Sequence, residues 1–304
     1  MRATRRAVLH GVLAGAALMM PLRVQAQSGE APVRRIPSSG EAIPPVGLGS
    51  WITFNVGDDA ELRAECAAVM RAFFEMGGRV IDSSPMYGSS QAVIGDGLRT
   101  LGQPSTLFAA DKVWISSGAR GPSQIEESRR LWDVPRFDLL QVHNLLSWEE
   151  HLKTLFAMKT AGQLRYVGIT TSEGRRHDLF EEIMRRQPLD FVQLTYNIVD
   201  REAEERILPL AADRGMGVIV NHPFQQGVLL RRLSGRPLPS WAPDIGASSW
   251  AQFVLKFIIS HPAVTVAIPA TSQVAHVREN MAAMAGPMPD TAMRRRMADH
   301  VKDL

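Results

Sequence analysis

From residue 46 onward, short apolar stretches alternate with longer segments whose apolar residues recur every three or four positions. Short apolar runs are typical of buried strands, and the longer spacing is typical of helices that cover a sheet. In the segment 59–76, for example, Leu62, Cys66, Val69 and Phe73 follow the helical spacing. The predicted strands are 46–51, 79–82, 107–113, 137–144, 166–171, 191–197, 217–221 and 264–269, and the predicted helices are 59–76, 91–101, 123–132, 148–161, 175–186, 203–214, 248–260 and 274–285.

Eight strands that alternate with eight helices predict an α/β fold, a (β/α)8 TIM barrel. Residues 34–44, with a turn at 38–41, predict an N-terminal hairpin, and 290–304 predict a C-terminal extra helix. The competing architecture is a doubly wound open sheet, which holds a dinucleotide with a G-x-G-x-x-G turn. The stretch 47–52, GLGSWI, lacks the third glycine, so we predict a single barrel domain over 34–304.

The first 26 residues differ from the rest of the chain. A twin-arginine pair (Arg5-Arg6), an apolar run (11–20) and a small-residue cleavage site (24–26) follow one another. This order is typical of a Tat-type signal peptide, and it predicts export by the twin-arginine machinery to the periplasm. The apolar run is about half of what spans a bilayer, so no membrane anchor is expected after cleavage. The signal is assigned to 1–26 and a linker to 27–33; the alternative is a basic tail on a cytoplasmic protein.

The charge balance changes once this leader is removed. The chain has 34 Lys and Arg against 31 Asp and Glu, but Arg2, Arg5, Arg6 and Arg23 lie in the leader, which has no acid. The remaining 30 bases and 31 acids give no support to a protein that binds nucleic acid or a membrane surface. The one cysteine, Cys66, cannot form an intramolecular disulfide, and no Cys/His set indicates a metal site.

Four polar side chains fall at the predicted carboxyl ends of successive strands. Asp82 ends the second strand and Tyr87 follows on its loop, whereas Lys112 and His143 lie near the ends of the third and fourth. In a TIM barrel this end of the strands carries the chemistry. Alone, Asp82 could cap the next helix and His143 could be a core histidine, but an unpaired ammonium at Lys112 would be costly in an apolar strand. The four together therefore indicate one site.

These side chains can assist the reduction of a carbonyl group, which needs a hydride on carbon and a proton on oxygen. A tyrosine can donate that proton, although its ordinary pKa is about 10. We expect the Lys112 ammonium to lower the pKa of Tyr87 and Asp82 to keep Lys112 charged. His143 would orient the carbonyl and stabilise the developing charge. The group therefore predicts hydride transfer to an aldehyde or ketone, with Tyr87 as general acid.

Six different short sequence blocks follow one another along the chain, each at a predicted strand or strand end. They are Asp-Ser-Ser-Pro-Met-Tyr-Gly (82–88), Asp-Lys-Val (111–113), Gln-Val-His-Asn (141–144), Tyr-Val-Gly-Ile-Thr (166–170), Gln-Leu-Thr-Tyr-Asn (193–197) and Ile-Pro-Ala-Thr-Ser (268–272), with Glu279-Asn280 after the last. Each block is short, but in this order and at this spacing the chain resembles the aldo-keto reductase family. The resemblance covers nearly the whole chain after the leader, from Gly47 to Asn280.

The resemblance implies a small carbonyl substrate and a nicotinamide cofactor that lies extended across the strand ends. NADP is the expected cofactor, with NAD as the alternative. It implies that Trp51 lies beside the nicotinamide, that Gln193 binds its carboxamide, and that the segment after the last strand holds the adenosine. The implied cofactor-binding residues are Ser50, Trp51, Thr170, Thr171, Gln193, Asn221, Pro269, Thr271, Ser272, His276, Arg278 and Asn280.

Two departures from the family pattern concern the cofactor. Ala270 and His276 stand where family members that prefer NADP carry cations, so we expect Ser272, His276 or Arg278 on the 2′-phosphate. Asn221 and His222 replace a Tyr-Ser pair whose tyrosine stacks on the nicotinamide, and Asn221 cannot stack in that way. The face of the nicotinamide must therefore be covered by another group.

A third departure concerns the substrate, because only 24 residues follow Asn280. We therefore expect the long C-terminal substrate loop of some family members to be absent. The pocket is then more open, or it is completed by Trp51, Met86, Trp114 and the loop after Phe224, where residues 231–245 leave room for a lid. Two other functions stay open: a nicotinamide-binding barrel that acts as a sensor or partner subunit with little turnover, and an aldolase that forms a Schiff base on Lys112. The first would explain how a periplasmic protein could function without a supply of reduced cofactor.

Overall fold

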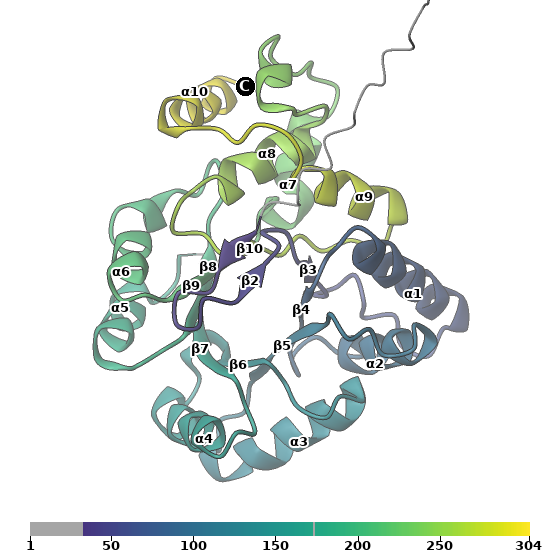
Figure 1. Ribbon diagram of the computed structural model, residues 1–304, viewed down its shortest axis with the longest axis vertical. Coiled ribbons are helices and arrows are strands. Elements are labelled where there is room, and N and C mark those ends of the chain that lie inside the picture. Colours follow the sequence, from purple (N-terminus) through teal and green to yellow (C-terminus); the bar gives the residue numbers. More distant parts are fainter. Residues whose placement is uncertain (1–32, 173) are drawn as a thin grey trace, which may run out of the picture. The chain divides into compact units, whose positions relative to one another are not determined.

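The computed structural model describes residues 33–172 and 174–304, so the predicted signal peptide and residues 27–32 of the predicted linker lie outside the described residues. Its main feature is one sheet of eight strands that pair in chain order, and every pair is parallel (Figure 1). All eight strands were predicted. Their bounds are β3 (Leu48–Gly49), β4 (Val80–Asp82), β5 (Phe108–Val113), β6 (Leu139–Val142), β7 (Tyr166–Thr170), β8 (Phe191–Thr195), β9 (Gly217–Asn221) and β10 (Val266–Ala267).

Backbone hydrogen bonds along a seam between β3 and β10 close the sheet into a barrel. Gly47 N donates to Ala267 O (2.8 Å) and Gly49 N to Pro269 O (3.0 Å). A Cβ atom on Gly49 would lie 2.8 Å from the Ile268 carbonyl oxygen, so only glycine permits this approach. The predicted (β/α)8 barrel is confirmed, and the seam places the loop after β3 beside the segment after β10.

The helices lie outside the barrel and pack their apolar faces on the strands, which are buried on both sides (Figure 1). The eight predicted helices are present. The pattern missed α7, which is too short at six residues to show a helical period. The bounds are α1 (Ala60–Glu75), α2 (Ser90–Thr100), α3 (Gly121–Trp132), α4 (Trp148–Thr160), α5 (His177–Arg186), α6 (Ile207–Asp213), α7 (Val228–Leu233), α8 (Trp250–Ile259) and α9 (Val274–Ala282).

The predicted N-terminal hairpin, β1 (Arg34–Arg35) and β2 (Ala42–Ile43), lies across the amino-terminal end of the barrel (Figure 1). Ile36 and Ile43 are fully buried there and pack against side chains inside the barrel. Glu41 holds the hairpin in place through its ion pair with Arg79 (3.0 Å) and a second ion pair with Arg165. The hairpin therefore fills this end, and the strand ends that carry the predicted site remain open.

The predicted C-terminal helix is α10 (Thr291–Lys302). Its Arg294 guanidinium pairs with Glu204 (2.8 Å), contacts the Tyr196 hydroxyl and lies 4.6 Å from the ring centroid of Phe257. This contact attaches the helix to the loop after β8. No helix in 33–172 or 174–304 has the length and apolar character needed to cross a membrane.

Candidate active site

Asp82 and Lys112 form a buried ion pair at the ends of neighbouring strands. Strand alternation places Lys112 on the inner face of β5 with Phe108 and Ala110, while Asp82 lies on the inner face of β4. Lys112 Nζ lies 2.5 Å from Asp82 Oδ1 and donates to Ser83 O at 2.7 Å. The predicted pair is therefore present, and attraction to Asp82 offsets part of the desolvation cost of burying the Lys112 ammonium.

Two glutamines that the sequence interpretation did not assign to Asp82 also bind this carboxylate. Gln193 Nε2 donates to Asp82 Oδ2 at 3.0 Å and Gln141 Nε2 to the same atom at 3.4 Å. Burial raises the pKa of Asp82 and outweighs the opposing effect of Lys112. For Lys112, burial by itself lowers the pKa, but the charges of Asp82 and Tyr87 reverse this and raise it. The ammonium therefore stays charged.

The Tyr87 ring lies against this pair, with its centroid 5.2 Å from Lys112 Nζ. We expected the ammonium to lower the pKa of Tyr87. Burial of the phenol is the larger effect and raises this pKa, although Lys112 opposes it. Lys112 thus acts in the expected direction, but the net pKa is raised, because the depth of burial could not be read from the sequence. The phenol keeps its proton at neutral pH, which suits a proton donor.

His143 faces Tyr87 edge to face, with the ring centroids 5.7 Å apart. Burial, reinforced by the Lys112 charge, lowers the pKa of His143 to about 2, so the imidazole is neutral. Its Nδ1 lies 2.7 Å from Ser84 Oγ, which already accepts a hydrogen bond from Met86 N. In the tautomer in which Ser84 Oγ donates a hydrogen bond to Nδ1, the imidazole proton lies on Nε2. His143 can then donate a hydrogen bond to a carbonyl oxygen without being charged.

These side chains open into a pocket of about 470 Å³ at the carboxyl ends of the strands. Lys112 is fully buried behind the pocket wall, beside Asp82. Thr171, Pro269, Ser272 and Arg278 are not among the described side chains that line it. The predicted residues that do line it are Ser50, Trp51, Asp82, Tyr87, His143, Thr170, Gln193, Asn221, Thr271, His276 and Asn280.

The loop after β9 supplies the aromatic ring that Asn221 cannot. Asn221 Oδ1 accepts from Thr195 Oγ1 (2.7 Å) and its Nδ2 donates to Thr171 O (3.0 Å), so this side chain braces three strand ends. The next residue, His222, stacks on Trp51, with the rings 5.6 Å apart and 10° from parallel. The sequence interpretation treated the pair Asn221-His222 as the loss of a stacking aromatic ring, but His222 places an imidazole ring in the pocket wall.

The pocket suits an extended ligand with polar groups along its length. From Tyr87 and His143 it continues along the ends of β9 and β10 to the first turns of α9, where Thr271, His276 and Asn280 line it. Thr271 Oγ1 accepts from Gln273 N (3.1 Å) just before α9, which begins at Val274 and whose N-terminus favours a phosphate group. The residues present therefore fit a nicotinamide dinucleotide.

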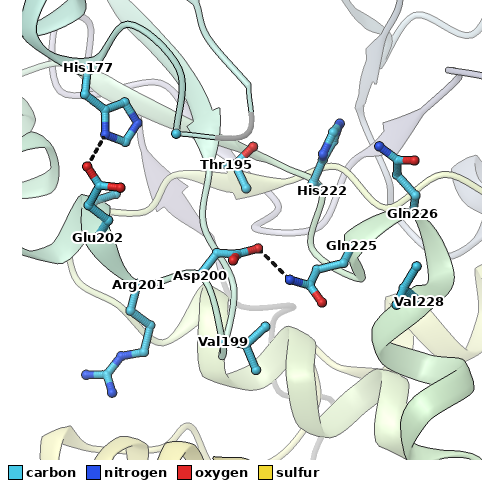
Figure 2. A pocket seen from close by; sticks show the side chains of 12 residues that line it. His177, Thr195, Val199, Asp200, Arg201, Glu202, His222, Gln225, Gln226 and Val228 are labelled. Carbon is cyan, nitrogen blue, oxygen red and sulfur yellow. Dashed lines mark hydrogen bonds and ion pairs between the residues drawn. The ribbon is translucent and has the colours of Figure 1, made fainter.

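A second pocket, of about 630 Å³, is lined mainly by residues of the loops after β8 and β9 (Figure 2). His222 and Gln226 line both pockets, and Asp200 accepts from Gln225 Nε2 (2.9 Å) within the second one. His177 pairs with Glu202 at 3.0 Å on its far side. Its wall mixes acidic, basic and amide groups, and none of the four predicted catalytic side chains reaches it.

Comparison with known proteins identifies the family. Residues 45–298 match the model of the aldo/keto reductase family. The chain is similar to the methylglyoxal reductase YeaE of Escherichia coli, with 27% identity over 257 residues that cover 83% of this chain and 89% of that protein. It is also similar to the L-galactose dehydrogenase of Arabidopsis thaliana, with 25% identity over 289 residues, covering 83% and 88% of the two chains.

Solved structures show the same architecture. An aldo/keto reductase from Klebsiella pneumoniae, in complex with NADP and acetate, superposes with a TM-score of 0.73 at 24% identity, covering 86% of this chain and 93% of that chain. The glycerol dehydrogenase of Gluconobacter oxydans gives 0.74 at 20% identity, covering 90% and 95%. With the match over residues 45–298, the chain belongs to the aldo/keto reductase family and is an oxidoreductase of that type.

Proposed function

We propose that this protein reduces an aldehyde or ketone to an alcohol with NADPH. The observation that carries the proposal is the contact of a protonated, buried Tyr87 with the Lys112 ammonium and a neutral His143, at one end of a pocket that suits a dinucleotide. The similarity to a methylglyoxal reductase and to a structure that holds NADP supports the same reaction. Arg278, His276 and Ser272 are the candidates for its 2′-phosphate.

When bound, a reduced nicotinamide would supply the hydride for the carbonyl carbon. The Tyr87 hydroxyl gives its proton to the carbonyl oxygen, and His143 Nε2–H holds that oxygen in place. Lys112 lies close enough to stabilise the tyrosinate that remains, and Asp82 keeps Lys112 oriented. A proton from water restores the phenol, so each turnover converts one carbonyl, one NADPH and one proton into alcohol and NADP⁺.

The replacement Tyr87→Phe tests the assignment of the proton donor. Because general acid catalysis contributes about 10²–10⁴-fold, we expect kcat for aldehyde reduction to fall within that range. NADPH binding, followed by quenching of protein fluorescence, should change little, because the ring is retained. In the wild type, the raised pKa of Tyr87 predicts that ionisation of the phenol reduces the rate only above about pH 10. A Tyr87→Phe enzyme with wild-type kcat would contradict the assignment.

We also propose that the chain is exported in folded form through the twin-arginine pathway and acts in the periplasm. The support is the order of the Arg5-Arg6 pair, the apolar run and the cleavage site. Folding before export would let the protein acquire its cofactor in the cytoplasm.

A further inference from the structure

Three large apolar side chains are exposed around the mouth of the active-site pocket. Ile52, Met86 and Trp114 are 62%, 43% and 39% exposed. They stand on the loops that follow the neighbouring strands β3, β4 and β5. Ile52 and Met86 line the pocket, and the Trp114 ring lies 6.5 Å from the His143 ring. We refer to these three side chains as the apolar rim. Exposed apolar groups gathered at one site are typical of a binding surface.

Ile52 is held in a conformation that a β-branched residue rarely adopts. Its φ is +65°, in the left-handed region, where the branched Cβ is crowded by its own backbone. The turn is fixed by hydrogen bonds from Thr53 N to Trp51 O (2.7 Å) and from Asn55 N to Ile52 O (3.2 Å). The exposed side chain gains little packing in return for this strain. Such strain is typical of functional positions, so a bound ligand is the natural partner of this side chain.

Met86 and Trp114 are also held in fixed positions beside His143. Met86 N donates to the same Ser84 hydroxyl that binds His143 Nδ1. Trp114 is held by Gln124, whose Oε1 accepts from Trp114 N (2.7 Å) and whose Nε2 donates to Trp114 O (3.0 Å). Both apolar side chains are thus presented to solvent next to the group that would orient a carbonyl.

The charges of the pocket lie away from the apolar rim. The described residues that line the pocket beside the rim are Trp51, Thr53, Tyr87 and Asn144, and none of them carries a charge at neutral pH. Of the charged lining residues, Asp82 is buried in its ion pair with Lys112, whereas Arg175 and Glu279 come from the loop after β7 and from α9. A substrate that approaches His143 over the rim therefore meets apolar surface and no ionic partner.

We infer that the substrate is a carbonyl compound with an aryl ring or a long aliphatic chain, which the apolar rim holds while the carbonyl reaches Tyr87 and His143. Small hydroxylated carbonyl compounds would leave this surface in water. The inference rests on the proposed reduction and specifies its substrate. Burial of each methylene group should increase kcat/KM by about two- to fourfold until the rim is covered.

The first test is a series of aldehydes, reduced by the full chain with NADPH. We expect kcat/KM to rise from propanal through hexanal to octanal, and to be lower for glyceraldehyde than for propanal. Values that stay level or fall along the series would overturn the inference.

Variants of the apolar rim provide the second test, with the ratio of kcat/KM for octanal to that for propanal as readout. Trp114→Ala and Met86→Ala should each lower this ratio about tenfold. Met76→Ala is the matched control, because Met76 is 37% exposed at the end of α1, away from the pocket, and the ratio should not change. Ile52→Asn should lower the ratio without lowering the thermal midpoint, since asparagine tolerates positive φ. An unchanged ratio in all three rim variants would overturn the inference.

Binding of the alcohols separates this inference from the proposed reaction. Tryptophan fluorescence should report tighter binding of 1-octanol than of 1-propanol, and Trp114→Ala should reduce the difference. If no aldehyde supports NADPH oxidation but octanol binds more tightly, the proposed reaction fails and the apolar rim remains a binding surface. If propanal is reduced but neither rate nor binding rises with chain length, the inference fails alone.

Discussion

A second carboxyl group, that of Asp111, is buried directly behind the ion pair of the active site. Asp111 follows strand alternation to the outer face of β5, where its Oδ2 accepts from Gln91 Nε2 at 2.7 Å. Its Oδ1 accepts from Lys112 N, also at 2.7 Å. Burial raises the pKa of Asp111 to about 7 despite the opposing charge of Lys112. The sequence interpretation quoted this residue in a motif but gave it no role.

Asp111→Asn should change how stability depends on pH. Between about pH 4 and 7 the folded protein holds a proton on Asp111 that the unfolded chain has released, so stability falls as pH rises through this window. The fall is at most about 1.4 kcal/mol per pH unit for one proton. Urea unfolding at pH 5 and pH 8 should show a smaller difference for Asp111→Asn than for the wild type. The exposed-carboxyl variant Asp58→Asn should keep the wild-type difference, and parallel curves for all three proteins would contradict the assignment.

For single residues, the sequence predicted which side chains meet, but not how burial shifts their pKa values. Lys112 could be recognised because an ammonium in an apolar strand needs a partner, and Asp82 is that partner. The direction of the Tyr87 pKa depends on the balance between burial and charge, which is set by side chains from several strands. Gln193 was assigned to the cofactor, yet its amide donates to Asp82. Such contacts depend on side-chain rotamers, which no sequence spacing specifies.

Among the elements, the β1–β2 hairpin is the one in which a substitution should most clearly change stability without changing catalysis. Ile43 is fully buried with Ile36 at the end of the barrel opposite the active site. Ile43→Ala should lower the free energy of unfolding by about 2–5 kcal/mol, because it leaves a cavity in a packed interior. Urea unfolding measures this loss, and kcat at temperatures below the transition should stay near the wild-type value. Val33→Ala, an exposed change beside the hairpin, should leave the free energy of unfolding almost unchanged. An equal effect of the two changes would contradict the role of the hairpin in filling this end of the barrel.

The sequence predicted the elements well where their patterns were long. All eight strands, the hairpin and α10 were found in place, since apolar runs and helical spacings leave a signal in the chain. It failed at α7, whose six residues fall in a region that we expected to be a loop or lid. The rest of that region includes a short 3₁₀ helix, Ala242–Ile245, with Ala242 and Ile245 buried. Short segments that owe their structure to packing cannot show a period of their own.

For the whole molecule, the seam between β3 and β10 determines when the barrel can close during folding. Gly47 and Ala267 stand near opposite ends of the barrel sequence, and their hydrogen bond closes the sheet. The barrel is therefore complete only when nearly the whole chain has been made. The proposed twin-arginine export, which transports folded chains, would require this seam to close before export.

The double change Arg5→Lys/Arg6→Lys should keep most of the protein in the cytoplasm at full length. The pathway recognises the arginine pair, and lysine retains the charge but not the guanidinium geometry. Cell fractionation of a Gram-negative host, with immunodetection of both the precursor and the cleaved form, measures the result. Arg23→Lys, outside the pair, is the control and should leave export unchanged. Cleaved protein in the periplasmic fraction of the double variant would contradict the proposal.

The hairpin that fills the amino-terminal end of the barrel also limits the order in which molecules can enter and leave. Among the described residues, Ile36 and Ile43 fill that end and the active-site pocket opens at the carboxyl ends of the strands, so cofactor and carbonyl compound would share one entrance. Whichever molecule lies deeper must arrive first and depart last. In kinetic terms, a dinucleotide that lies beneath the carbonyl compound would give an ordered sequence, in which it binds before the carbonyl compound and the alcohol leaves before the oxidised dinucleotide.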